Sequence, residues 1–181
     1  DGLRITGSTR DRAKCRYNLS EMTSLSQQAV MHFVARSRHP TTPCQALKSI
    51  KVQVRRARDT TIELSYSLDG DVAALLIPSG GGPRRSDRLW QHTCFEAFVA
   101  GPAAEGGYFE FNFAPSTEWA AYHFTAYRKG MSAVEAARPP RISVSRDAGR
   151  LSLDAVIDLE SLPTLRDSPS LRLALSAVVE D

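Results

Sequence analysis

The sequence is poor in cysteine and lacks any long apolar stretch. Its 181 residues include three cysteines, Cys15, Cys44 and Cys94, none of them in a Cys-x-x-Cys arrangement. An odd number of cysteines without that spacing argues against a disulfide framework and against a zinc ribbon. No run of 18 apolar residues occurs, which excludes a transmembrane helix.

Common catalytic and nucleotide-binding signatures are also missing. The sequence contains no Gly-x-Ser-x-Gly, no His-Glu-x-x-His and no dinucleotide-binding fingerprint. The glycines at 80–82 precede Arg84, Arg85 and Arg88, and glycines beside cations could hold a phosphate group. They lack the Gly-Lys-Ser/Thr ending of a P-loop and its strand-to-helix setting. We therefore interpret 80–82 as part of a surface loop.

Basic residues are concentrated at the start of the chain. The formal net charge is +3. Residues 1–40 carry seven basic and three acidic residues, whereas residues 41–181 carry 16 basic and 17 acidic residues. A nucleic-acid-binding domain needs a clustered basic face, and the main part of the chain has none. We therefore expect no nucleic-acid partner.

Cysteine usage also bears on the compartment. Uneven usage is more typical of a reducing compartment, so we expect a cytoplasmic location. The sequence opens with Asp1 rather than Met and shows no signal peptide of its own. A signal peptide upstream of Asp1 is the alternative.

Residues 20–36 have the spacing of an amphipathic helix. Ser20 is a residue type that caps helices, and His39-Pro40 ends the pattern. The apolar residues stand three or four positions apart, at Met22, Leu25, Ala29 and Phe33. We therefore predict an atypical basic segment over residues 1–38, with a helix over 20–36, that lies outside the main domain.

From residue 50 onwards the apolar period changes to two. Turn residues such as Asp147-Ala148-Gly149 separate the alternating stretches, which is typical of half-buried strands. Eight or nine short strands without helices between them predict an all-β fold, an antiparallel two-sheet sandwich. We also expect an apolar strand over 72–77 and one helical turn over 158–163. The clearest alternation covers 50–54, 62–68, 108–113, 151–157 and 171–177.

Eleven of the fourteen aromatic residues lie between Leu89 and Arg128. In this region an acidic strand (LWQHTCFEAF, 89–98) is followed by an aromatic strand and an Asn-x-x-Pro turn (YFEFNFAPS, 108–116). The segments WAAY and YRKGM come next. This order resembles the bacterial DOMON-like domain proteins, a group allied to the family 9 carbohydrate-binding modules. The resemblance covers residues 39–181.

The resemblance implies a DOMON-like β-sandwich over residues 39–181 that binds a ligand and is not an enzyme. It favours a carbohydrate, so the partner we expect is a small polar ligand, a sugar. A haem-binding domain of electron-transfer type is one alternative, and a protein-interaction module without a small ligand is another. The family tends to continue into a further strand where this chain ends, so a last strand could be missing.

Three polar residues of the expected hairpin are candidate ligand-binding residues. Glu110 and Asn112 stand two positions apart, so they point to the same face of one strand. Glu96 lies on the strand that we expect to pair with it and has the same even-numbered parity. Carboxylates and amides can hold sugar hydroxyls, and a pair of carboxylates could also hydrolyse a glycosidic bond. Cross-strand hydrogen bonds that fix the strand register are an equally good explanation of the same residues.

Two further candidates lie on the strand expected over 119–127. Trp119 and His123 share one face of that strand, and the indole of Trp119 could stack on a sugar ring. If this strand pairs with 108–113, all five candidates could line one concave surface. We expect Tyr122 in the core, together with Phe109, Phe111 and Phe113.

The haem alternative would use His92, His123 and Met131 as axial ligands. No Cys-x-x-Cys-His motif for covalent attachment occurs. His92, Cys94 and Glu96 alternate and are metal-ligating residue types. Side chains on one strand face stand about 7 Å apart, whereas zinc ligands lie within about 2.3 Å of the metal. We therefore expect no metal site, and no cofactor outside the haem alternative.

Overall fold

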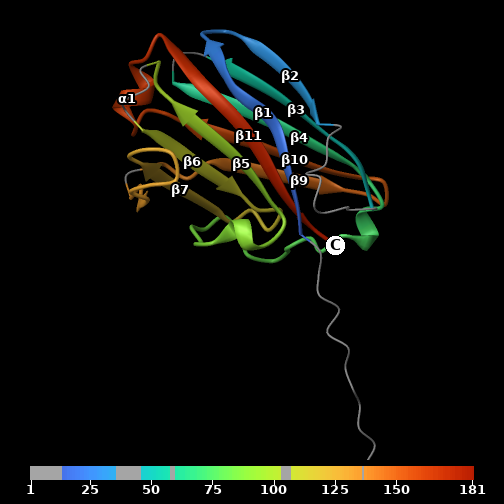
Figure 1. Cartoon of the computed structure of the whole chain (residues 1–181). Helices are drawn as coiled ribbons and strands as arrows, with labels where there is room; N and C mark the ends of the chain where they lie inside the picture. Colours follow the sequence, from blue (N-terminus) through green and yellow to red (C-terminus); the bar gives the residue numbers. More distant parts are fainter. Residues whose placement is uncertain (1–13, 36–45, 58–59, 103–106, 136) are drawn as a thin grey trace, which may run out of the picture.

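Two antiparallel sheets pack face to face as a β-sandwich (Figure 1). The structure is a computed structural model and describes residues 14–35, 46–57, 60–102, 107–135 and 137–181. The six-stranded sheet has the order β1 (Lys14–Ser26), β11 (Ser170–Glu180), β5 (Cys94–Ala100), β6 (Tyr108–Phe113), β7 (Trp119–Phe124), β8 (Ser132–Ala133). The five-stranded sheet has the order β2 (Val30–Ala35), β3 (Leu47–Ala57), β4 (Thr61–Gly70), β10 (Arg150–Asp158), β9 (Arg141–Arg146).

The helical segments are short: η1 (Val72–Ala74), η2 (Leu89–Gln91) and α1 (Pro163–Arg166). None of the helices in the described ranges is long and apolar enough to cross a membrane. The strand expected over 72–77 is wrong, because the backbone NH of Leu75 donates locally to the carbonyl oxygen of Val72 at 3.3 Å. The expected helical turn is α1, which lies a few residues later than 158–163.

Alternate residues of both sheets form the core. In β4, in β10 and in β3 from Ile50 onwards, every second residue is buried, as the period of two predicts. Tyr66 of β4 packs against Phe95 of β5, with ring centroids 4.8 Å apart. The Tyr66 hydroxyl also donates to the backbone oxygen of Glu96 at 3.1 Å, which links the two sheets. The strands predicted over 50–54, 62–68 and 151–157 are therefore confirmed.

The hairpin of β5 and β6 has the predicted antiparallel pairing, with Phe95 opposite Phe113. Phe111 and Phe113 are buried in the core, and Phe109 is partly buried against it. The predicted inward direction of these three phenylalanines is confirmed. Because side chains alternate along a strand, the intervening residues of β6 face outward.

Residues 20–35, the described part of the predicted helix, are not helical. They belong to β1 and β2, which are joined by a turn in which Gln28 has a φ of 60°. The pairing of β1 with β11 shifts register on both sides of Ser20, and such shifts interrupt the period of two. A bulged strand, a turn and a second strand together space apolar residues three and four apart, which mimics a helix.

Residues 14–35 are part of the sandwich. β1 pairs with β11 at the edge of one sheet, and β2 pairs with β3 at the edge of the other. Cys15, Tyr17 and Leu25 of β1 are buried in the common core. The sheets therefore do not begin near residue 39, because this segment gives each sheet an edge strand. Residues 1–13 and 36–38 of the predicted segment lie outside the described residues.

Candidate ligand-binding groove

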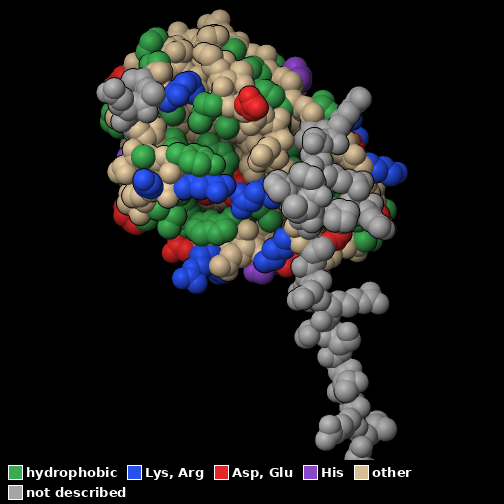
Figure 2. Space-filling view, in the orientation of Figure 1, with side chains coloured by type: hydrophobic (Ala, Val, Ile, Leu, Met, Phe, Trp, Pro, Cys, Tyr) green, Lys and Arg blue, Asp and Glu red, His purple; other side chains and the backbone are tan. Residues whose placement is uncertain are grey.

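A groove lies on the outer face of the six-stranded sheet, the face turned away from the core. Its volume is about 900 Å³. Pockets for drug-sized ligands have volumes of roughly 300–1,000 Å³. Figure 2 shows hydrophobic side chains in a hollow on this face, with a row of lysine and arginine side chains across it. The hollow is therefore large enough for a small ligand and carries both apolar and charged groups.

Small side chains of β11 form part of the floor of the groove. The pairing of β11 with β5 places Ser176 opposite Glu96 and Ala174 opposite Phe98. Serine and alanine project only a short distance from a sheet. The floor therefore lies below the larger side chains that surround it.

Aromatic rings form the walls. Tyr108 and Phe124 stack with ring centroids 4.7 Å apart and an interplanar angle of 3°. Phe98 meets Tyr108 edge-on, with centroids 6.1 Å apart. Tyr127, in the connection from β7 to β8, is 77% exposed and also lines the groove. Exposed ring faces of this kind can pack against the apolar face of a ligand.

The segment around η2 covers one end of the outer face. Leu89 packs with Tyr122 and Ala120 in a small apolar cluster outside the main core. Trp90 meets Tyr122 edge-on at 5.5 Å, and the Tyr122 hydroxyl donates to Asp87 Oδ1 at 2.7 Å. Burial, with this hydrogen bond, raises the pKa of Tyr122 to about 12. Tyr122 was expected in the core, but it holds η2 on the outer face instead.

The structure brings Glu96, Glu110 and Asn112 together on the outer face. β5 and β6 place Glu96 opposite Asn112, and Nδ2 of the buried Asn112 donates to Glu110 Oε1 at 3.0 Å. The Cys94 thiol donates to Asn112 Oδ1 at 3.7 Å. Burial raises the pKa of Glu110, although the bond from Asn112 opposes the shift. The amide therefore fixes the Glu110 carboxylate inside the groove.

Arg16 of β1 compensates the charge of Glu96. Its Nη1 lies 3.2 Å from Glu96 Oε2, and the two side chains are 47% and 2% exposed. The carboxylate is thus buried, whereas its partner reaches it from the groove surface. Sequence reasoning missed Arg16 because the residues before Ser20 showed no usable period.

Trp119 and His123 lie on the opposite face of the sheet. β7 pairs with β6 so that Trp119 is opposite Phe113 and His123 is opposite Phe109, and paired residues share one face. Trp119 is buried in the main core, with the Arg85 guanidinium 5.7 Å from its ring centroid. The five sequence candidates therefore do not line one surface.

The three residues of the haem alternative do not meet in one site. His123 packs against Phe109 on the core side, with ring centroids 4.9 Å apart, whereas Met131 lines the groove. His92 precedes β5, and its Nδ1 lies 2.9 Å from Glu180 Oε2. His92 is not among the residues that line the groove. These residues do not fit as axial ligands of one haem.

No group of three or more metal-ligating side chains occurs within the described part of the chain. Cys94, which alternates with His92 and Glu96, is buried. Burial, reinforced by the charge of Glu96, raises the pKa of its thiol well above the usual range. A buried thiol of this kind is unreactive.

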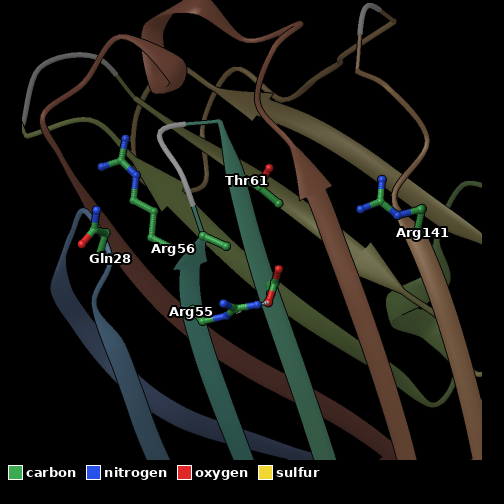
Figure 3. A pocket seen from close by; sticks show the side chains of 7 residues that line it. Gln28, Arg55, Arg56, Thr61 and Arg141 are labelled. Atoms are coloured by element: carbon green, nitrogen blue, oxygen red, sulfur yellow. Dashed lines mark hydrogen bonds and ion pairs between the residues drawn. The ribbon is translucent and has the colours of Figure 1, made fainter.

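A second hollow lies at one end of the five-stranded sheet (Figure 3). Arg55 Nε donates to Glu63 Oε2 at 2.8 Å. The Arg56 side chain points away from that pair, and its Nη2 donates to the backbone oxygen of Ser168 at 2.8 Å. None of the described residues that line this hollow is aromatic. Because Arg55 and Arg56 are engaged with the protein and none of the described lining residues is aromatic, the groove of the six-stranded sheet is the better candidate.

Sequence reasoning found the acidic residues of the groove but not its rings. Phe98 stands two residues after Glu96, and Tyr108 stands two residues before Glu110. Strand parity therefore places each ring on the same face as its acid. A search for aromatic residues with the parity of the acids would have found both.

Comparisons of the chain with protein-family models, with curated proteins and with solved structures find no match. The charges, the aromatic rings and the buried polar groups of the groove therefore carry the functional argument.

Proposed function

We propose that the protein is a non-catalytic, DOMON-like module that binds a carbohydrate in the groove of the six-stranded sheet. The observation that best supports this is that aromatic rings and buried polar groups share one groove. Tyr108 and Phe98 offer ring surfaces, and Glu96, Glu110 and Asn112 lie beside them. A sugar has an apolar C–H face and a rim of hydroxyl groups, so it needs both kinds of surface.

The polar groups divide into acceptors and donors. The carboxylates of Glu96 and Glu110 can accept hydrogen bonds from sugar hydroxyls, and the Arg16 guanidinium can donate them. At about 900 Å³, the groove lies near the upper end of the range for small-ligand pockets. A short oligosaccharide therefore fits the proposal better than a single sugar unit.

Tryptophan fluorescence offers a direct test, because the chain has two tryptophans and only Trp90 lines the groove. In a Trp119→Phe variant, Trp90 is the only fluorophore of its type. We expect a saturable change in emission when a bound oligosaccharide from a broad glycan panel is titrated in. If no member of the panel binds the protein by fluorescence or calorimetry, the carbohydrate proposal is wrong.

Point variants separate groove binding from an effect on the fold. Tyr127→Ala removes an exposed ring and should weaken binding about fivefold, the equivalent of about 1 kcal/mol. Glu96→Gln should weaken it further by removing a buried acceptor. Arg55→Ala, on the other sheet, is the matched control and should leave the affinity unchanged. A Soret absorption band in the purified protein would instead favour the haem alternative with ligands other than those predicted.

A further inference from the structure

The charges that line the groove do not balance. Three glutamates and two arginines contribute to its lining. Arg16 lies 3.2 Å from Glu96, and Arg128 lies with its guanidinium 5.2 Å from the ring centroid of Tyr127 at the rim. Glu110 forms no ion pair with any residue that the structure describes. Glu21 also lacks an ion pair but is exposed, so Glu110 is the half-buried carboxylate of the groove without a paired cation. The charge of Arg16 acts on Glu110 from beyond ion-pair distance, and burial outweighs its effect on the pKa of Glu110.

The position of Glu110 makes that charge costly. Its one hydrogen bond to another described side chain comes from the neutral amide of Asn112, at 3.0 Å. Burial raises the pKa of Glu110, which shows that the surroundings disfavour the ionised form. A hydrogen-bonded cation offsets part of the cost of a carboxylate that is shielded from water. A ligand with a positive charge at this point would supply that cation.

Aromatic rings stand around the same carboxylate. The strand pairings place Phe98 opposite Glu110 on one side and Tyr122 opposite it on the other, and Tyr108 follows the same face of β6. Ring faces attract cations through their quadrupole, and rings grouped around an ammonium are a recurring mode of amine recognition. A carboxylate set among rings therefore selects an ammonium group over a neutral one.

Ser176 supplies an independent observation. Its side chain lines the groove and is buried, at 4% exposure, and its Oγ has no hydrogen-bond partner among the described residues. Ser176 lies opposite Glu96 on the neighbouring strand. A buried hydroxyl without a partner is unfavourable, and a ligand hydroxyl at this point would satisfy it. The groove thus needs one cation and at least one hydroxyl.

We infer that the ligand is an amino sugar, a short oligosaccharide that carries protonated primary amines. One amine binds the Glu110 carboxylate between the rings, and the hydroxyls of the sugar bind Ser176 and Glu96. The inference rests on the proposed function, because it specifies the chemistry of the sugar in the same groove. The formal net charge of +3 disfavours the binding of cations to the protein in general. The preference for a charged amine must therefore come from the groove itself.

Three β-1,4-linked tetrasaccharides of the same length test the inference: one of glucosamine, one of N-acetylglucosamine and one of glucose. They differ only in carrying a charged amine, a neutral amide or a hydroxyl group at one ring position. We expect calorimetry at pH 6 and low salt to show about tenfold tighter binding of the glucosamine tetramer than of the other two. The preference should fall when salt is added, because part of it is electrostatic.

Matched variants locate the preference. Glu110→Gln keeps the shape of the side chain and should abolish the preference for glucosamine, while weak binding of the neutral tetramers remains. Glu160→Gln makes the same charge change on a residue that is 43% exposed and does not line the groove, and it should change the preference less than about twofold. Thermal unfolding of both variants checks that the fold is intact.

The outcomes are distinguishable. If the neutral tetramers bind as tightly as glucosamine, the amino-sugar inference is overturned and the carbohydrate proposal stands. If none of the three binds and the wider glycan panel also fails, both are overturned. If tetralysine binds as tightly as the glucosamine tetramer, the groove recognises cations without reading the sugar, and the inference is wrong.

Discussion

The outer faces of the two sheets are built from the same alternation but differ in what they do with polar residues. On the five-stranded sheet, the outward residues of β3 are exposed, and charges pair across strands, as Arg55 does with Glu63. On the six-stranded sheet, Glu96 and Asn112 face outward and are nevertheless buried. One face carries exposed charges, whereas the other holds buried polar side chains in a groove.

The difference arises from what covers each face. The η2 segment packs Leu89 and Trp90 over Tyr122 on the six-stranded sheet, and aromatic rings border the rest of the groove. In β5, six of seven residues are buried, so both of its faces are covered. A polar side chain under such a cover must find a partner, and those that find none within the chain indicate where a ligand could bind.

The largest effect is expected when the strands that join the two sheets are removed. A chain that begins at residue 36 loses β1 and β2, one edge strand from each sheet, together with buried Tyr17 and Leu25. We expect loss of cooperative unfolding in urea, followed by circular dichroism. A cooperative transition in this truncated chain would show that the sandwich begins after residue 35, as the sequence alone suggested.

The two tryptophans contrast the core with the groove. Trp119 is buried in the main core, so Trp119→Ala should lower the free energy of unfolding by about 3–5 kcal/mol. Trp90 is half-buried in the groove, so Trp90→Ala should cost less stability and should weaken ligand binding. Urea titrations and calorimetry of both variants measure this. Equal losses of stability would remove the distinction between the two sites.

Two ion pairs compare buried with exposed charge. Arg16→Leu leaves the Glu96 carboxylate, 2% exposed, without its partner and should cost about 1–2 kcal/mol, less than for a fully buried pair because Arg16 is half exposed. Arg55→Leu breaks a pair whose side chains are 52% and 34% exposed and should cost under about 1 kcal/mol. Chemical denaturation at low and at high salt measures both. A larger loss for Arg55→Leu would contradict the contrast.

The smallest effects are expected from two carboxyl groups with opposite pKa shifts. Burial raises the pKa of Glu110 above 4.5, so between the two values the folded state binds more protons than the unfolded state and stability falls as pH rises. Glu110→Gln should therefore stabilise the protein at neutral pH, and the gain should vanish below pH 4.5.

Asp69 on the other sheet should behave in the opposite way. The hydrogen bond from Arg150 lowers the pKa of Asp69 below 3.8, so its ionised form stabilises the folded state above that pH. Asp69→Asn should destabilise the protein at neutral pH, and the loss should disappear as the pH falls through the lowered pKa. Unfolding curves from pH 3 to pH 8 compare the two variants. If both substitutions stabilised the protein at neutral pH, or both destabilised it, the electrostatic difference between the two outer faces would be refuted.

Much of the fold and of the acidic site follows from local patterns in the sequence. A period of two places Phe109, Phe111 and Phe113 on one face of a strand and Glu110 on the other, because successive side chains point in opposite directions. The same rule predicted β3, β4 and β10 of the five-stranded sheet. It failed over residues 20–35, where a register shift and a turn changed the spacing.

Which residues share a face across two strands was decided only by the tertiary structure. Within one strand, alternation alone determines which side chains share a face. Between two strands, the turn that joins them determines which residues share a face. The connection from β6 to β7 closes with the Ala114 NH donating to the Glu118 carbonyl oxygen at 2.9 Å and with Thr117 at a φ of 69°. This geometry puts Trp119 opposite Phe113, in the core and away from Glu110. The sequence by itself determined β3, β4 and β10, the hairpin of β5 and β6, and the face shared by its acidic residues with Phe98 and Tyr108, because these depend on local alternation. Only the tertiary structure decided that Trp119 lies in the core and that η2 brings Trp90 onto the outer face, because these depend on turn geometry and on packing between distant segments.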